Sequence, residues 1–496
     1  MREFENRLQR ELLRGLRPND RLSRGSSFLE KAQGVECNVR GLEVYQEVIN
    51  PINNGPAYVW PYPMLHRLSH DNLLVSSNSF YSFEEGTWNA TPLVTEYLGE
   101  GSYSISGKEI WHIAESQNTW FAVNGNEVAF RVEGDDSVSL IDFPIKSGCY
   151  HKGRFVFGGF DPDKGWGDLA QVIQDVGALY DHNYPLDSLG KNWILWSSIG
   201  GGDFPLALFD NSRTQIDVAR LLTLVQQNQF GFMPIPYVGE IVCMKPLANN
   251  ILIYGTEGIA RIFFSNGDYG YERFANVGIS GRGCVVGDDK EHYFLSDRGG
   301  LYVTRENQTI TRLDYSNQLL PLVAEDVVMS MSSDERRVYI SGASACFVLN
   351  RLGEYWTLTE YPFSVTSIID GLGADVGVRS SAHFSNIDII TSSFDFGIRG
   401  NKTITGVHLG VTASDRPQIR VHFRLSTTGD WRQTGWFPTN KEGASYPRVV
   451  GNEFRVEVKS SDMDTFMLDY INLKWQSHDK RTIRGSSSDF QNQDVS

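Results

Sequence analysis

The chain of 496 residues carries a formal net charge of −15, is 41% hydrophobic and 12% aromatic, and contains 48 glycines. These proportions indicate a folded, β-rich protein with many tight turns and about two to four domains. The acidic charge excludes tight nucleic-acid binding through a basic face, although DNA can pass an acidic surface without adhering to it. No apolar run reaches the roughly 20 residues of a membrane span, and the charged N-terminus lacks a signal-peptide core, so we expect no export.

The cysteines are scattered along the chain and predict free thiols. None of the five is paired at the spacing of a metal site or a redox motif, and an odd number argues against a complete disulfide framework. We therefore expect buried thiols in a protein made in a reducing cytosol. The five are Cys37, Cys149, Cys243, Cys284 and Cys346.

Residues 1–55 differ in kind from the rest of the chain and form a leader. Eight basic residues precede residue 32, against five acidic ones. A helical spacing of apolar residues that ends at Pro18 predicts a short helix, so that the leader is partly helical. The apolar residues are Phe4, Leu8, Leu12, Leu13 and Leu16. A basic leader on an acidic protein favours docking to an acidic neighbour or a second copy; a locally packed tail is the alternative.

Residues 56–375 contain repeated strand–turn–strand segments that predict a β-propeller. Three similar segments, 251–259, 292–301 and 338–347, begin 41 and then 46 residues apart, which is the length of one blade. We expect Ile251, Phe294 and Ile340 in equivalent buried strands. Weaker copies begin at 73, 120, 154 and 193, so about seven blades are expected, with a partly helical insertion at 211–228. A β-sandwich or several small β-domains is the alternative.

Residues 385–476 alternate apolar and polar side chains with period two and predict a C-terminal antiparallel β-sandwich. Residues 477–496 are rich in Ser, Gln and Asp and are expected to form a flexible tail. The expected sandwich core comprises Phe454, Val456, Phe466, Leu468, Tyr470 and Leu473. The fold class is therefore mainly β: a leader, a propeller and a sandwich in chain order.

Short segments at both ends of the chain carry a family resemblance. They are 19–25 (NDRLSRG), 28–32 (FLEKA), 41–45 (GLEVY), 60–63 (WPYP), 470–476 (YINLKWQ) and 479–485. With a propeller between them, their order resembles that of the tail nozzle, or hub, proteins of short-tailed bacteriophages. The resemblance covers almost the whole chain as an order of loosely matched segments.

This resemblance implies a structural virion protein of the phage tail that is synthesised in the host cytoplasm. Its copies would form a ring, typically a homohexamer, below the portal and adaptor proteins. The ring would continue the DNA channel, retain the packaged genome and anchor tail fibres or spikes. The implied partners are other copies, portal, adaptor, fibre or spike proteins, and genomic DNA passing without sequence-specific binding or membrane insertion. The resemblance implies no enzyme activity, catalytic residue, metal or cofactor.

Charged residues near both ends are the candidate docking interface. Guanidinium groups can form bidentate pairs with carboxylates, of which the chain has 60. The candidate residues are Arg14, Arg17, Asp479, Lys480, Arg481 and Arg484.

Motifs that could carry chemistry are weak. Residues 82–88 resemble a shortened sialidase box, which is a folding turn even in sialidases. Residues 161–168 resemble a truncated calcium loop without its bidentate Glu, and an exposed turn is the simpler interpretation. His66 and His70 have the i, i+4 spacing of metal ligands on a helix but lack a third ligand. Residues 200–203 lack the Lys of a phosphate loop, and no serine lies in a nucleophile elbow.

Two alternatives to the structural ring protein stay open. A propeller glycosidase or lyase needs convergent carboxylates or a Tyr/Arg cluster in the central funnel. A carbohydrate- or protein-binding adhesin would use Trp431 and Trp436 as a stacking platform, and these residues are otherwise core or rim aromatics. Gel filtration separates the first hypothesis from both, because a nozzle forms rings.

Overall fold

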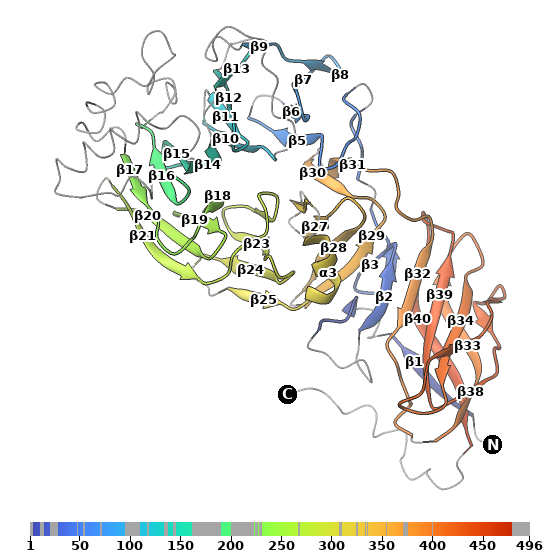
Figure 1. Ribbon diagram of the computed structural model, residues 1–496. Coiled ribbons are helices and arrows are strands. Elements are labelled where there is room, and N and C mark those ends of the chain that lie inside the picture. The colour runs from blue at the N-terminus through green and yellow to red at the C-terminus, as the bar shows by residue number, and fades with distance from the viewer. Residues whose placement is uncertain are drawn as a thin grey trace. The chain divides into compact units, whose positions relative to one another are not determined.

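Runs of β-branched and aromatic residues alternate with turns along the chain, and in the computed structural model these runs form strands (Figure 1). The structure describes residues 3–9, 14–19, 28–46, 48–52, 55–69, 72–94, 110–116, 119–132, 137–141, 145–160, 190–199, 223, 227, 231–265, 268–306, 310–323, 326–332, 334, 336–353, 355–370, 375–398 and 400–478. These residues belong to two compact units. The propeller unit comprises 47–344 and 363–381, and the terminal unit comprises 1–46, 345–362 and 382–496.

Five sheets of four or five strands form the blades of the propeller unit. The first is β5 (Met64–Arg67), β6 (Asn72–Val75), β7 (Phe80–Glu84) and β8 (Thr87–Ala90). The second is β10 (His112–Glu115), β11 (Thr119–Val123), β12 (Val128–Val132), β13 (Val138–Ile141) and β9 (Leu93–Val94). The third is β14 (Ile145–His151), β15 (Arg154–Phe160), β16 (Trp193–Trp196) and β17 (Gly231–Pro234).

The fourth and fifth blades follow the same plan. They are β18 (Ile241–Leu247), β19 (Asn250–Gly255), β20 (Ile259–Ser265) and β21 (Asp268–Ala275), then β22 (Val285–Gly287), β23 (Glu291–Leu295), β24 (Leu301–Arg305) and β25 (Thr311–Leu313). The helix α3 (Ser316–Val323) comes next, and two hairpins complete the unit: β26 (Val328–Met331) with β27 (Arg337–Ser341), and β30 (Val365–Asp370) with β31 (Asp375–Arg379).

The first strand of each sheet or hairpin lies on the inside of the unit. β10 lies beside β14, β14 beside β18, β22 beside β26, β26 beside β30, and β30 beside β5. Figure 1 shows β5, β10, β14, β18 and β30 turned toward a common centre. This arrangement places side chains from distant parts of the sequence around one space.

The structure has five blades, so the prediction of about seven is wrong. Arg154 and Trp193 were counted as central strands of separate blades, but they lie in β15 and β16 of one sheet. A long insertion between these strands gave them the spacing of a full blade. The hairpins β26–β27 and β30–β31 contribute only two strands each to this unit, because the chain leaves it after residue 344, returns at residue 363 and leaves again after residue 381.

The repeat itself was predicted correctly. Ile251, Phe294 and Ile340 lie in β19, β23 and β27, each the second strand of its sheet or hairpin in this unit, and each residue is fully buried. The predicted insertion at 211–228 falls largely outside the described residues.

Two sheets, antiparallel except for the parallel pair β2 (Leu29–Gln33) and β29 (Tyr355–Tyr361), make up most of the terminal unit. The first contains β3 (Val35–Cys37), β4 (Leu42–Val44), β40 (Met467–Ser477), β33 (Lys402–Thr412) and β37 (Ala444–Ser445), with β1 (Glu3–Leu8) on β40 and β38 (Val449–Gly451) on β33. Within this unit, the second contains β28 (Cys346–Leu352), β29 (Tyr355–Tyr361), β2 (Leu29–Gln33), β32 (Ile387–Thr391), β39 (Glu453–Ser460), β34 (Gln418–Arg424) and β35 (Arg432–Gln433), with β36 (Phe437–Pro438) on β34.

The leader is part of these sheets, which corrects the predicted division at residue 55. β1 is a strand over residues that were expected to begin a helix, and it pairs with β40 from Glu3 opposite Gln476 to Leu8 opposite Ile471. β2 pairs with β32, and β4 pairs with β40. The predicted unit at 385–476 is therefore completed by strands from the leader and from 345–362. Residues 479–496 lie outside the described residues.

Five of the six expected core residues of the C-terminal strands are buried: Phe454, Val456, Phe466, Leu468 and Leu473. Tyr470 is only half-buried, so its assignment to the core is wrong. Tyr470 pairs with Gly410 while Leu468 pairs with Val411, and this bulge in β40 shifts the side-chain alternation by one residue. The Tyr470 ring instead carries the guanidinium of Arg7 at 3.8 Å.

Candidate functional site

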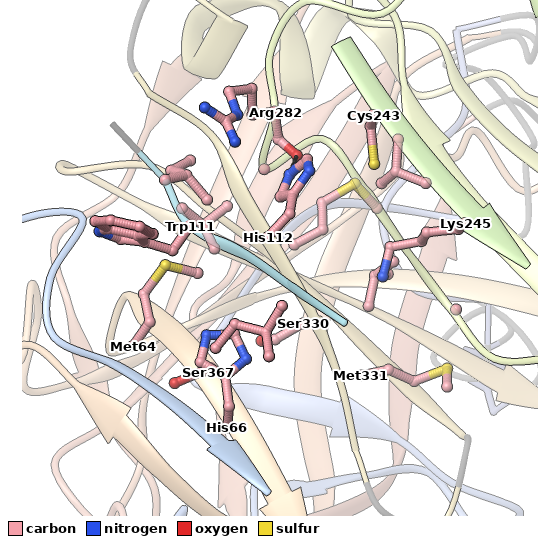
Figure 2. A pocket seen from close by; sticks show the side chains of 18 of the residues that line it. Met64, His66, Trp111, His112, Cys243, Lys245, Arg282, Ser330, Met331 and Ser367 are labelled. Carbon is pink, nitrogen blue, oxygen red and sulfur yellow. Dashed lines mark hydrogen bonds between the residues drawn. The ribbon is translucent and has the colours of Figure 1, made fainter. Parts of the chain in front are cut away.

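A cavity of about 400 Å³ lies at the centre of the propeller unit. It is lined by the inner strands β5, β10, β14, β18, β22, β26 and β30. Figure 2 shows His66, His112, Lys245 and Ser330 among the side chains around it. Such central cavities are a common place for ligands in closed β-folds, so this is the candidate functional site.

His112 connects the inner strands beside the cavity. Its Nε2 lies 3.0 Å from the carbonyl oxygen of Arg282, and its Nδ1 lies 2.8 Å from Oγ of Ser147. Because a carbonyl only accepts, Nε2 carries the hydrogen, and Ser147 donates to Nδ1. Ser147 Oγ in turn accepts from the backbone N–H of Met244 at 2.8 Å. This chain ties β10, β14, β18 and the residues before β22 together, so His112 has a structural role.

Both histidines of the cavity are neutral at neutral pH. Burial and then the charge of Lys245 lower the pKa of His66 to about 4. Burial and the neighbouring Arg282 charge lower the pKa of His112 well below its usual value. Every charged group that influences these histidines is basic, so the local potential is positive although the chain as a whole is acidic.

The described lining of the cavity contains Lys245 and Arg282 but no Asp or Glu. A glycosidase at this centre would need paired carboxylates, and the lining offers it no support. A cavity of this composition suits an anion, because fixed cations and neutral donors surround it.

The spacing of His66 and His70 does not indicate a metal site in this structure. His66 lies on the strand β5, where the i, i+4 argument for a helix does not apply, and His70 lies outside the described residues. Among the described residues, no group of three or more His, Cys, Asp or Glu side chains could hold a metal ion. The calcium-like loop at 161–168 and the glycines at 200–202 also fall outside the described part of the chain.

The sialidase-like segment is a structural turn. Glu85 and Gly86 connect β7 to β8 with φ of 48° and 83°, a left-handed pair that a two-residue hairpin loop requires. Thr87 Oγ1 donates to the Glu84 carbonyl at 3.0 Å, and Trp88 is buried against the Leu65–Leu74–Val378 cluster. The segment therefore stabilises one edge of the first blade.

Only two of the candidate docking residues lie in the described part of the chain. The Arg14 guanidinium lies 3.8 Å above the ring of Tyr355, whose side chain is half exposed. Arg17 forms an ion pair of 3.2 Å with Glu30, and both side chains are largely buried. Asp479, Lys480, Arg481 and Arg484 lie outside the described residues.

The tryptophans of the adhesin alternative carry cations on their rings. Trp431 lies 4.3 Å from the Arg455 guanidinium and 4.9 Å from that of Arg424. Trp436 lies 4.3 Å from the Arg420 guanidinium. Ring faces covered in this way are not open platforms for a sugar.

Sequence reasoning missed Lys245, His112 and Ser330, which only the closure of the ring brings to one cavity. One signal was present: Lys245 interrupts the apolar segment Ile241–Leu247, where a charge at an inner position needs a reason. The cysteines were predicted correctly as unpaired and buried, all five of them. No described helix has the length and apolar character that crossing a bilayer demands.

No protein-family model and no curated protein matches the chain. Solved structures that it is similar to include the extracellular domain of a putative one-component system from B. thetaiotaomicron (TM-score 0.40, 9% identity, 86% of this chain and 63% of that one). The β-propeller domain of Cps50 (Swd1) from Myceliophteria thermophila has a TM-score of 0.37 and 8% identity over 70% of this chain and 96% of that one. Kluyveromyces lactis Hsv2 has a TM-score of 0.32 and 9% identity over 60% and 83%.

The chain thus spans about three fifths of the bacterial extracellular domain. Because the TM-scores are low, the propeller assignment rests on the sheet order and the inner strands of this chain. No family is assigned by these comparisons.

Proposed function

We propose that this chain is the ring-forming nozzle subunit of a short-tailed phage tail. In this role it assembles with copies of itself, as a hexamer, below the portal and adaptor. It continues the DNA channel, retains the packaged genome and anchors fibres or spikes. The proposed location is the virion tail, after synthesis in the host cytoplasm, and the proposed role requires no catalysis.

The observation that best supports this proposal is that two strands containing segments of the family resemblance pair with each other. Residues 41–45 contain β4 and residues 470–476 lie in β40, and β4 pairs with the start of β40, where Leu42 lies opposite Leu468 and Glu43 opposite Met467. Gly41 approaches β40 so closely that an added Cβ would lie 2.1 Å from the Leu468 carbonyl oxygen. Two segments that are far apart in sequence, yet both resemble the nozzle family, thus lie in neighbouring strands of one sheet.

Within this proposal the two sheets of the terminal unit pack face to face as a sandwich. The Phe396 ring stacks on Trp475 of β40 with centroids 4.6 Å apart, and it lies 6.1 Å from the Phe454 ring of β39. One aromatic side chain therefore contacts both sheets, as expected for a shared core.

The glycosidase and the adhesin are less well supported. The described cavity lining offers no carboxylate pair, and the two tryptophans have cations on their rings. The cavity lining therefore does not support a glycosidase, and the tryptophans do not support a sugar-binding adhesin.

Sedimentation velocity and negative-stain microscopy of the purified full chain test the proposal. We expect concentration-dependent assembly into closed rings of uniform size. A chain that stays monomeric up to its solubility limit, or one that hydrolyses a host-surface glycan, would contradict it.

The docking residues are tested by charge reversal in the same assay. Arg14→Glu removes only a cation–π contact at a half-exposed tyrosine, worth about 0.5–1 kcal/mol, so the fold should persist. Arg481→Glu with Arg484→Glu tests the C-terminal group, and Arg298→Glu at an exposed turn of the propeller unit is the control. Arg17→Glu is unsuitable, because it would place a carboxylate beside Glu30. Rings of wild-type stability from both charge-reversal variants would exclude these residues from the interface.

A further inference from the structure

We propose that the central cavity of the propeller unit binds a small molecule with a carboxylate or phosphate group, held by the ammonium of Lys245. This inference is independent of the proposed tail function. It follows from three polar side chains that line one cavity and lack partners within the described chain.

Lys245 is a part-buried cation without a carboxylate. No hydrogen bond or ion pair to its Nζ joins it to any other described residue, and the described cavity lining contains no Asp or Glu. Other described lysines do have partners: Lys31 pairs with Asp388 at 2.6 Å, Lys146 with Glu240 at 2.7 Å, and Lys474 with Glu5 at 3.2 Å. The Lys245 ammonium thus has no counter-charge within the described chain, and a cavity without carboxylates suits an anion from outside it.

Two further groups face the same space. Nε2 of His66 and Oγ of Ser330 are both buried, and neither has a hydrogen-bond partner in the described structure. Ser330 is 6% exposed, so bulk water does not readily satisfy its hydroxyl. Buried polar groups are nearly always paired, and an oxyanion would accept from both the hydroxyl and the imidazole N–H. Figure 2 shows Ser330 and His66 near each other in this view and Lys245 on another part of the cavity wall.

The protonation state of His66 fits this role. Burial and the Lys245 charge keep the imidazole neutral at neutral pH, so it can donate one hydrogen bond without adding a second buried charge. A volume of about 400 Å³ lies at the lower end of the range for small-molecule sites. It accommodates a small organic acid or a phosphorylated compound.

The test is isothermal titration calorimetry of the full chain with sodium phosphate and, separately, sodium acetate in chloride-free buffer at neutral pH. We expect saturable one-site binding of at least one probe, and the preferred probe identifies a phosphate or a carboxylate as the natural group. Lys245→Gln should weaken binding by about tenfold or more, the loss of a charge-assisted hydrogen bond. Ser330→Ala should weaken it less, and the control Lys290→Gln, at an exposed turn, should leave it unchanged.

Thermal unfolding of the same variants gives a second measurement. Without anion, Lys245→Gln should unfold at the wild-type temperature or above it, because it removes an uncompensated charge. The probe should raise the unfolding temperature of the wild type but not of Lys245→Gln. Absence of saturable binding of both probes to the wild type, or equal binding by the wild type and Lys245→Gln, overturns the proposal.

Discussion

Replacing Gly41 by alanine is expected to weaken the pairing of β4 with β40. Gly41 precedes β4, and a Cβ at this position would lie 2.1 Å from the Leu468 carbonyl oxygen and 2.9 Å from Cα of Asp469. Carbon and oxygen atoms in contact lie about 3.3 Å apart, so one backbone must move by roughly 1 Å. The obstacle is main chain on both sides, which no rotamer change can relieve.

The cost follows from the contacts around this glycine. Overpacking costs about 1–3 kcal/mol. The shift also strains the hydrogen bonds from Val44 N to Phe466 O at 3.1 Å and from Asn38 N to Gly41 O at 2.9 Å, each worth about 1 kcal/mol. We therefore expect Gly41→Ala to reduce the stability of the β4–β40 pairing by about 2–5 kcal/mol.

Hydrogen exchange measured by mass spectrometry reports this pairing locally, and urea unfolding reports its effect on the whole chain. Peptides that cover β4 and residues 466–470 should exchange faster in Gly41→Ala, while peptides of the propeller blades should not change. Gly435→Ala is the matched control in the same unit, because no atom lies within 4 Å of its Cβ position. Exchange and urea midpoints equal in the two variants would refute the steric argument.

Two further predictions concern the terminal unit. Phe454→Ala should lower the free energy of unfolding by about 3–5 kcal/mol and Tyr470→Ala by clearly less, because only the first is buried; equal urea midpoints would contradict this. Burial opposes ionisation of Glu457, but hydrogen bonds from His422 and Arg420 outweigh it and hold the pKa of Glu457 well below its usual 4.5. The stability that this carboxylate contributes is therefore complete above pH 4.5 and is lost as the pH falls below it. Glu457→Gln should therefore reduce the loss of stability at acidic pH. An unchanged loss of stability at acidic pH would exclude Glu457 as its cause.

The sequence predicted local repeats well, because they depend on residues close together. The hairpins around Ile251, Phe294 and Ile340 have strand alternation and turn residues within about ten positions, and the structure places all three residues equivalently. The number of blades was not predictable in this way. Spacing alone could not show that Trp193 belongs to the same sheet as Arg154, because an insertion can imitate a repeat.

Local sequence patterns could not predict the candidate site. Lys245 and Ser330 are single polar residues in separate inner strands, and only the arrangement of β18 and β26 around one centre relates them. The assignment of Tyr470 to the core was also wrong because of a feature that depends on pairing between distant strands. The bulge in β40 is set by its pairing with β33, and an alternation rule cannot foresee one extra residue.

The spacing of apolar residues at the start of the leader fits a helix and a strand equally well. Phe4 and Leu8 are four residues apart, a spacing that puts two side chains on one face of a helix and equally on one face of a strand. Pairing with the edge of β40 makes this segment a strand. Leu8 is buried and Phe4 stacks on Trp475, while Glu3, Glu5 and Arg7 face solvent.

Several charged residues of the leader, among them Arg17 of the candidate docking interface, form contacts within the terminal unit. Glu5 pairs with Lys474, Arg7 lies on Tyr470, and Arg17 pairs with Glu30, so these groups stabilise the terminal unit itself. Of the described leader arginines proposed for docking, Arg14 is the one whose contact, with a half-exposed tyrosine, leaves it able to meet a neighbouring subunit. A ring interface at the leader should therefore centre on Arg14 and Tyr355.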